Sequence, residues 1–131
     1  MFKKFFKSSN GQAVTELALV LPIFLLLVFG VIEMSRIGYS YLTLNNAVRS
    51  GARVASLGGL DNDIKNTIKG SAPLFDGASI TIQITPNEST RRSGSSVMIN
   101  ASYPVYLNTP FLSQVLPNPV TISTSLAMRI E

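Results

Sequence analysis

Glu16 is the residue whose type and position most clearly point to chemistry. It stands at the front of an uncharged apolar run, five residues after Gly11, in the stretch SSNGQAVTELALVLPIFLLLVFGVIEM. The basic residues before it are Lys3, Lys4 and Lys7. A carboxylate inside a membrane usually has a partner, and cutting the chain between Gly11 and Gln12 would create one, the new α-amino group. Glycine suits such a cut because its missing side chain lets an enzyme approach the backbone closely.

A simpler interpretation of Glu16 stays open. An acid at the centre of a bilayer costs about 2.5–3.5 kcal/mol on insertion scales and less near the interface. Glu16 lies at the end of the apolar run and not in its middle, so its carboxylate can also sit among lipid headgroups without any protein partner.

The composition excludes several other kinds of chemistry. The 131 residues contain no Cys and no His, which excludes disulfides, Ser-His-Asp and Cys-His catalytic sites, and zinc sites built on these ligands. An acid-only site using Asp61, Asp76 or Glu88 stays open, but each is expected to be an exposed loop acid. Much of the net charge of +4 comes from the three N-terminal lysines, so no nucleic-acid partner is expected. We expect that the protein is not an enzyme and that it binds no cofactor and no metal.

The apolar run predicts a transmembrane segment. Residues Leu17–Ile32 carry no charge, and the small and apolar residues from Ala13 extend the segment to about 13–33, close to the ~20 residues that cross a bilayer. The lysines precede it, so the positive-inside rule places the N-terminus in the cytoplasm and the rest of the chain outside. The alternatives are a buried helix of a soluble domain and a cleaved secretory signal, but the nearest small-x-small triplet, 38–40, lies beyond two charges.

The helical pattern continues past the membrane. Apolar residues recur at spacings of three and four, at Ile37, Tyr41, Leu44, Val48, Ala52 and Ala55. We predict one helix over about 13–57, with Pro22 tolerated inside it and Gly58-Gly59 ending it. A stripe of small residues, Ala47, Gly51 and Ala55, can serve close contact with another subunit, but packing on the chain's own sheet is the favoured interpretation. Tyr39 and Tyr41 are expected in an interfacial aromatic belt.

The remaining residues predict a small α+β domain. Ile64 and Ile68 have helical spacing within 61–69, and period-two alternation with β-branched residues predicts strands over 80–85, 97–103 and 120–130. Residues 111–116 can form a helical turn, and Arg91 and Arg92 are expected to be solvated at a loop tip. The predicted fold class is α+β, with a long N-terminal helix, transmembrane in its first half, packed on a small three-stranded antiparallel sheet.

The N-terminal residues also resemble a known family. The chain resembles the TadE-like pseudopilins of the tight-adherence (Tad/Flp) pilus, a class of type IV pilin-like precursors. The residues that carry this resemblance are Gly11, Glu16, the Leu21-Pro22 pair, Gly30-Val31-Ile32-Glu33 at the end of the apolar run, Arg36, and the run from Asn46 to Arg53. The resemblance is dense over about the first 57 residues. It implies that a membrane prepilin peptidase cuts between Gly11 and Gln12, and that Glu16 becomes the fifth residue of the processed chain.

The resemblance implies three segments: a cytoplasmic leader over 1–11, a long helix over 12–57 and an extracytoplasmic domain over 58–131. It implies a minor pseudopilin that acts in pilus assembly and cell adhesion, at the inner membrane or within the fibre. The implied partners are the prepilin peptidase, other pilins and pseudopilins, the inner-membrane pilus platform and the lipid bilayer. The alternative is an uncleaved single-pass binding or scaffold module of the cell envelope. The same residues fit a TadE-like role and the role of the closely related TadF-like proteins.

Overall fold

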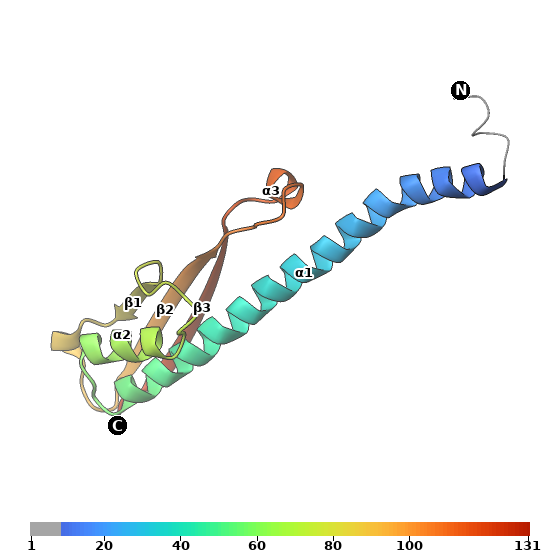
Figure 1. Ribbon diagram of the computed structural model, residues 1–131. Coiled ribbons are helices and arrows are strands. Elements are labelled where there is room, and N and C mark those ends of the chain that lie inside the picture. The colour runs from blue at the N-terminus through green and yellow to red at the C-terminus, as the bar shows by residue number, and fades with distance from the viewer. Residues whose placement is uncertain (1–8) are drawn as a thin grey trace.

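The computed structural model describes residues 9–131. The leader lysines, Lys3, Lys4 and Lys7, lie outside the described residues. A long helix projects far beyond a compact α+β domain that is built around its other end (Figure 1). The predicted fold class, a long apolar N-terminal helix with a three-stranded antiparallel sheet, is confirmed.

The long helix, α1, runs over Ser9–Ser56 and contains 48 residues, which is about 72 Å at 1.5 Å per residue. It begins four residues before the predicted Ala13. Pro22 lies inside it without ending it. The predicted stop at Gly58-Gly59 is confirmed: Gly58 has φ +79°, and the Gly59 amide donates to the Val54 carbonyl at 2.9 Å. A positive φ followed by such a backward hydrogen bond is the usual glycine-based end of a helix.

The second helix, α2, covers Asp61–Gly70 and packs against α1. Its two fully buried residues, Ile64 and Ile68, lie over Gly51 of α1. A Cβ atom added at Gly51 would stand 2.5 Å from Cγ1 of Ile68. The small-residue stripe is therefore buried within the chain itself, as the favoured interpretation held, although its glycine contacts α2 and not the sheet.

The sheet has the order β1-β2-β3 and is antiparallel throughout. Its strands are β1 (Thr81–Thr85), β2 (Ser96–Val105) and β3 (Val120–Arg129). A short 3-10 helix, η2 (Glu88–Thr90), lies in the first connection, and one helical turn, α3 (Leu112–Val115), lies in the second. Each strand is within two residues of its predicted ends, because alternation marks the strands clearly.

The core lies where α1 meets β2, β3 and α2. Its fully buried large side chains are Leu44, Val48, Ile64, Ile68, Val97 and Ile99. All predicted members of the buried α1 face are buried or half-buried except Tyr41, which is exposed. Tyr41 was predicted both on that face and in an interfacial belt, and its exposure fits only the belt.

The loop after β1 differs from the prediction at one arginine. Arg92 is exposed as expected, but the Arg91 side chain is only 8% exposed. Its Nη2 forms an ion pair with Asp61 at the start of α2, and its Nε donates to the Pro86 carbonyl at 3.0 Å. Arg91 therefore joins this loop to α2. Spacing could not show this contact, because the pair is 30 residues apart in the sequence.

Candidate functional site

Gly11 and Gln12, which flank the predicted cut, lie in the first turns of α1. The helix begins at Ser9, so the peptide bond between them is helical. The hydroxyl of Thr15 donates a 2.9 Å hydrogen bond to the Gly11 carbonyl oxygen. Unwinding about one turn of α1 at this bond would present it in an extended form.

Glu16 lies one helical turn after Gln12 on the same face. The side-chain amide of Gln12 donates to Oε1 of Glu16 at 3.4 Å, and both side chains are exposed. Helical side chains tilt toward the N-terminus and meet residues four positions earlier. A free α-amino group on Gln12 would therefore lie about one turn from the Glu16 carboxylate. The structure brings Gly11, Gln12 and Glu16 together, as their spacing predicts.

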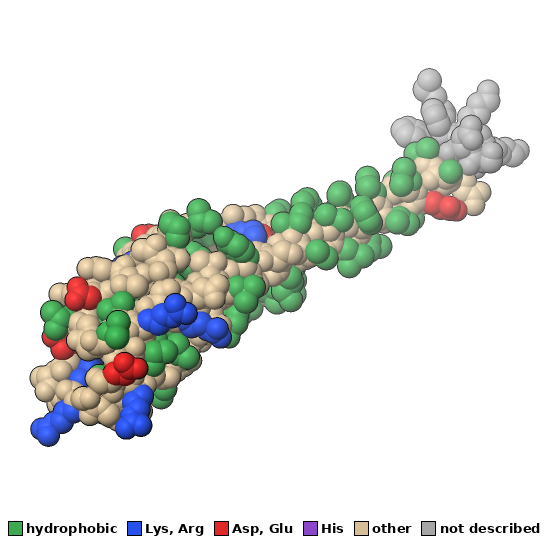
Figure 2. All heavy atoms as spheres, turned by 90° about the horizontal axis from the view of Figure 1, so that it is seen from below, with side chains coloured by type: hydrophobic (Ala, Val, Ile, Leu, Met, Phe, Trp, Pro, Cys, Tyr) green, Lys and Arg blue, Asp and Glu red, His purple; other side chains and the backbone are tan. Residues whose placement is uncertain are grey.

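An uncovered apolar belt follows Glu16 along α1. Every residue from Gln12 to Phe29 is exposed, although most of them are large and hydrophobic. Figure 2 shows hydrophobic side chains along the visible face of the projecting part of the helix. In the described part of the chain, one helix is long and apolar enough to cross a membrane, and it is this one. A surface this apolar requires a cover in the working protein.

A second polar group lies where the belt meets the domain, and sequence reasoning found only half of it. Glu33 is 4% exposed. Its spacing of three residues from Arg36 in a helix predicts a weak ion pair between the two side chains. Arg36 does donate to its Oε2 at 2.7 Å. Oε1 of Glu33 also accepts hydrogen bonds from the Thr109 hydroxyl at 2.7 Å and from the backbone N–H of Asn108 at 3.2 Å. The second nitrogen of the Arg36 guanidinium donates to the Tyr106 carbonyl at 3.2 Å.

This group ties the connection between β2 and β3 to α1. We call Glu33, Arg36, Asn108 and Thr109 the collar. Its helix half was visible in the sequence as an i, i+3 ion pair. Its other half was not, because Asn108 and Thr109 are 75 and 76 residues from Glu33 and stand in a loop without a periodic pattern. An acid that ends an apolar run was the available signal.

The acids considered for an acid-only site have structural partners. Glu88 accepts the backbone amide of Asp61 at 3.1 Å, which satisfies a free N–H at the start of α2. Asp76 accepts the amide of Ala78 and the hydroxyl of Ser79, each at 3.1 Å. These bonds hold a helix start and a turn, so the geometry assigns these acids to local structure.

Comparison with known families gives one match. Residues 11–53 match the family model described as TadE-like protein. The match begins at Gly11, and it contains Glu16, the whole apolar belt and the two collar residues of α1. No curated protein and no solved structure matches the chain. The resemblance drawn from the sequence is therefore confirmed for the long helix, since residues 11–53 of this chain are similar to the TadE-like family.

Proposed function

We propose that this protein is a minor pseudopilin of a Tad/Flp-type pilus that acts in pilus assembly. The observation that carries the proposal is the combination on α1: a TadE-like segment beginning at Gly11, a carboxylate five residues later, and a bare apolar half-helix. TadE-like proteins are associated with the Tad pilus and are structural or assembly components. A helix that is bare in the isolated chain suits a protein that exchanges a lipid cover for a cover of neighbouring subunits.

In this proposal the chain is made as a precursor. Residues 1–11 form a cytoplasmic leader, and a prepilin peptidase cuts between Gly11 and Gln12. The segment over about 13–33 then holds the processed chain in the inner membrane, with the domain over 58–131 outside. Lys3, Lys4 and Lys7 fix this orientation by staying in the cytoplasm.

Glu16 is the proposed assembly residue. After the cut, the amine of Gln12 and the carboxylate of Glu16 carry opposite charges about one helical turn apart. At the edge of a bilayer both charges are partly desolvated, so each favours a direct partner more strongly than it would in water. The partner amine belongs either to the same chain or to a neighbouring subunit. Either pairing sets the depth at which the helix docks against neighbouring subunits while the protein is extracted from the membrane.

The test replaces Glu16 in cells that make this pilus. We expect Glu16→Ala to leave the amount of membrane-bound protein unchanged and to abolish most surface pili. Glu16→Gln should fail similarly, because its amide keeps the shape but loses the charge. The readouts are an immunoblot of the membranes and a count of pili by electron microscopy. Val14→Ala is the matched control, since it alters a nearby exposed residue of the same helix and leaves the carboxylate. Normal piliation with both Glu16 variants would remove the assembly role.

A further inference from the structure

The connection between β2 and β3 is unusual in composition and position. We call residues 106–119 the hairpin tip. It contains no Asp, Glu, Lys or Arg, and none occurs anywhere between Arg92 and Arg129. It displays large apolar side chains: Phe111 is 65% exposed and Val115 is 82% exposed. A loop tip in water normally carries polar residues, so this composition indicates a different environment.

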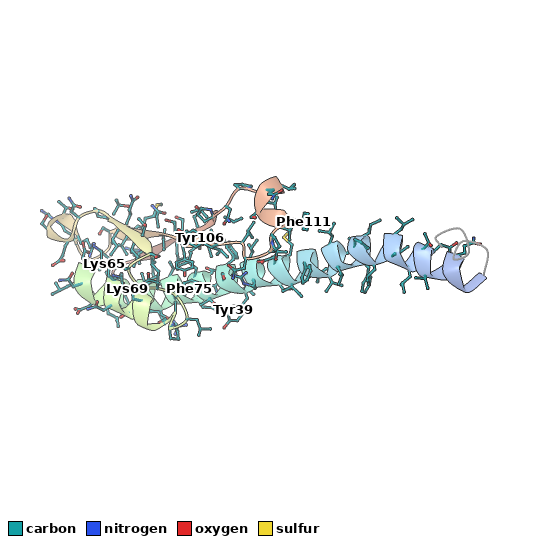
Figure 3. All side chains as sticks on the ribbon, turned by 45° about the horizontal axis from the view of Figure 1, so that its top comes forward. Tyr39, Lys65, Lys69, Phe75, Tyr106 and Phe111 are labelled. Atoms are coloured by element: carbon teal, nitrogen blue, oxygen red, sulfur yellow. The ribbon has the colours of Figure 1, made fainter. Side chains whose placement is uncertain are left out.

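The hairpin tip lies beside the part of α1 that is predicted to be in the membrane. Figure 3 shows Phe111 close to the helix at the edge of its projecting half, with Tyr106 nearer to the domain. The two elements share an open apolar groove, whose lining includes Leu26, Leu27, Gly30, Leu107, Leu112 and Leu116. Leu26 stands seven residues before Glu33, about 10 Å further along the helix. The tip therefore reaches well past the collar toward the N-terminus.

The collar fixes this depth. Glu33 holds Asn108 and Thr109, and Arg36 holds the carbonyl of Tyr106, so three successive parts of the loop are bound to one side of α1. The buried charge of Glu33 is fully engaged by donors from its own chain. A satisfied polar group of this kind suits the boundary between headgroups and hydrocarbon, where Tyr39 and Tyr106 are also exposed.

We propose that the hairpin tip inserts into the outer leaflet of the bilayer beside α1. This rests on the proposed single-pass orientation, in which the bilayer surrounds residues 13–33. Lipid is the expected cover of the hairpin tip, because the surface of the tip is continuous with the apolar belt of α1. A bilayer whose hydrocarbon surrounds Leu26 and Leu27 must also meet the groove and the side chains of Phe111 and Val115.

The backbone of the tip is suited to such an environment. Three of its residues, Pro110, Pro117 and Pro119, have no N–H group that would need a partner. The side chain of Asn118 bonds to both the amide and the carbonyl of Leu107, at 3.0 and 3.4 Å. The amide of Leu116 donates to the carbonyl of Leu112 at 2.9 Å. These features lower the number of backbone groups that would be left unsatisfied in hydrocarbon.

The test uses the fact that the chain has no native Cys. Single variants Val115→Cys, Val20→Cys and Ser93→Cys of the full-length chain are labelled with the fluorophore NBD. They are reconstituted at high lipid-to-protein ratio in vesicles of phosphatidylcholine and phosphatidylglycerol, with and without nitroxide-labelled acyl chains. Val20 reports the span. Ser93, an exposed residue at the other end of β2, about 30 Å away along the strand, reports the water-facing side.

We expect the nitroxide lipids to quench the label at position 115 to an extent similar to position 20, and to leave position 93 unchanged. Phe111→Cys should give the same result at an independent site. Quenching at 20 but not at 111 or 115 would overturn the insertion and leave the span intact. A label at 115 that is shielded from water but not quenched would mean that another protein copy covers the tip, which also overturns it. Loss of quenching at all positions would contradict the span itself.

Discussion

At the scale of single residues, the most consequential side chain is Glu33. It is almost fully buried at the level where the apolar belt ends, and it accepts three hydrogen bonds from Arg36, Asn108 and Thr109. Hydrogen bonds to a charged acceptor are stronger than those between neutral groups. A buried donor that loses its acceptor also lowers the stability of the fold, because it is no longer hydrogen-bonded to water or protein. Glu33 therefore decides where the hairpin tip is held.

Replacing this carboxylate should loosen the tip. We expect Glu33→Ala to lower the free energy of unfolding by about 1–3 kcal/mol, since it leaves the donors of Asn108 and Thr109 without an acceptor. Thr109→Ala should cost less, because it removes only one of the bonds. Thermal unfolding in detergent measures the stability, and hydrogen exchange at Asn108 reports the local opening. Equal stability and exchange in wild type and Glu33→Ala would contradict the anchoring role.

Gly51 gives a second prediction at this scale. Its Cα lies against Ile68, so we expect Gly51→Ala to destabilise the domain by about 1–3 kcal/mol through overpacking. Gly38→Ala is the matched control: Gly38 is also within α1, but no atom lies within 4 Å of an added Cβ. That variant should be neutral or stabilising by up to about 1 kcal/mol, because alanine favours a helix. Similar melting temperatures for the two variants would show that α2 does not pack closely on Gly51.

At the scale of elements, regular patterns made most of the fold predictable. Alternation in residues such as Val97 and Ile99 located the strands, and Ile64 and Ile68 located α2. α1 extends back to Ser9, the first described residue, which lies four residues before the predicted start at about Ala13. The contacts of Glu33 with Asn108 and Thr109, and that of Arg91 with Asp61, could not be predicted, since each joins segments 30 or more residues apart. Local spacing carries no information on such pairs.

The ion pair between α2 and the β1–β2 loop yields a prediction for these elements. The guanidinium of Arg91 is buried, and Asp61 is its acidic partner. We expect Asp61→Asn to lower the free energy of unfolding by about 1–3 kcal/mol, since a buried charge then loses its counter-charge. Asp63→Asn removes an exposed acid from the same first turn of α2 and controls for the helix dipole. Equal losses for the two variants would assign the effect to the dipole alone.

At the scale of the whole molecule, the chain divides into a domain with a buried core and a helix half whose apolar side chains are exposed. The domain buries its own core around the C-terminal half of α1, whereas every residue from Gln12 to Phe29 in the N-terminal half is exposed. Figure 1 shows that α1 runs without a break from its projecting half into the domain. The exposed apolar half agrees with the proposed role of α1 as a membrane anchor.

The N-terminal residue of the processed chain tests the proposed precursor most directly. The full-length protein is recovered from membranes of cells with and without a prepilin peptidase, and its intact mass and N-terminal residue are determined. We expect a chain that begins at Gln12, or at its cyclised form, only when the peptidase is present. Cyclisation would remove the amine proposed to pair with Glu16, so the two forms are distinguished by mass. A chain that begins at Met1 under both conditions would contradict processing, and it would favour an uncleaved membrane-anchored binding module.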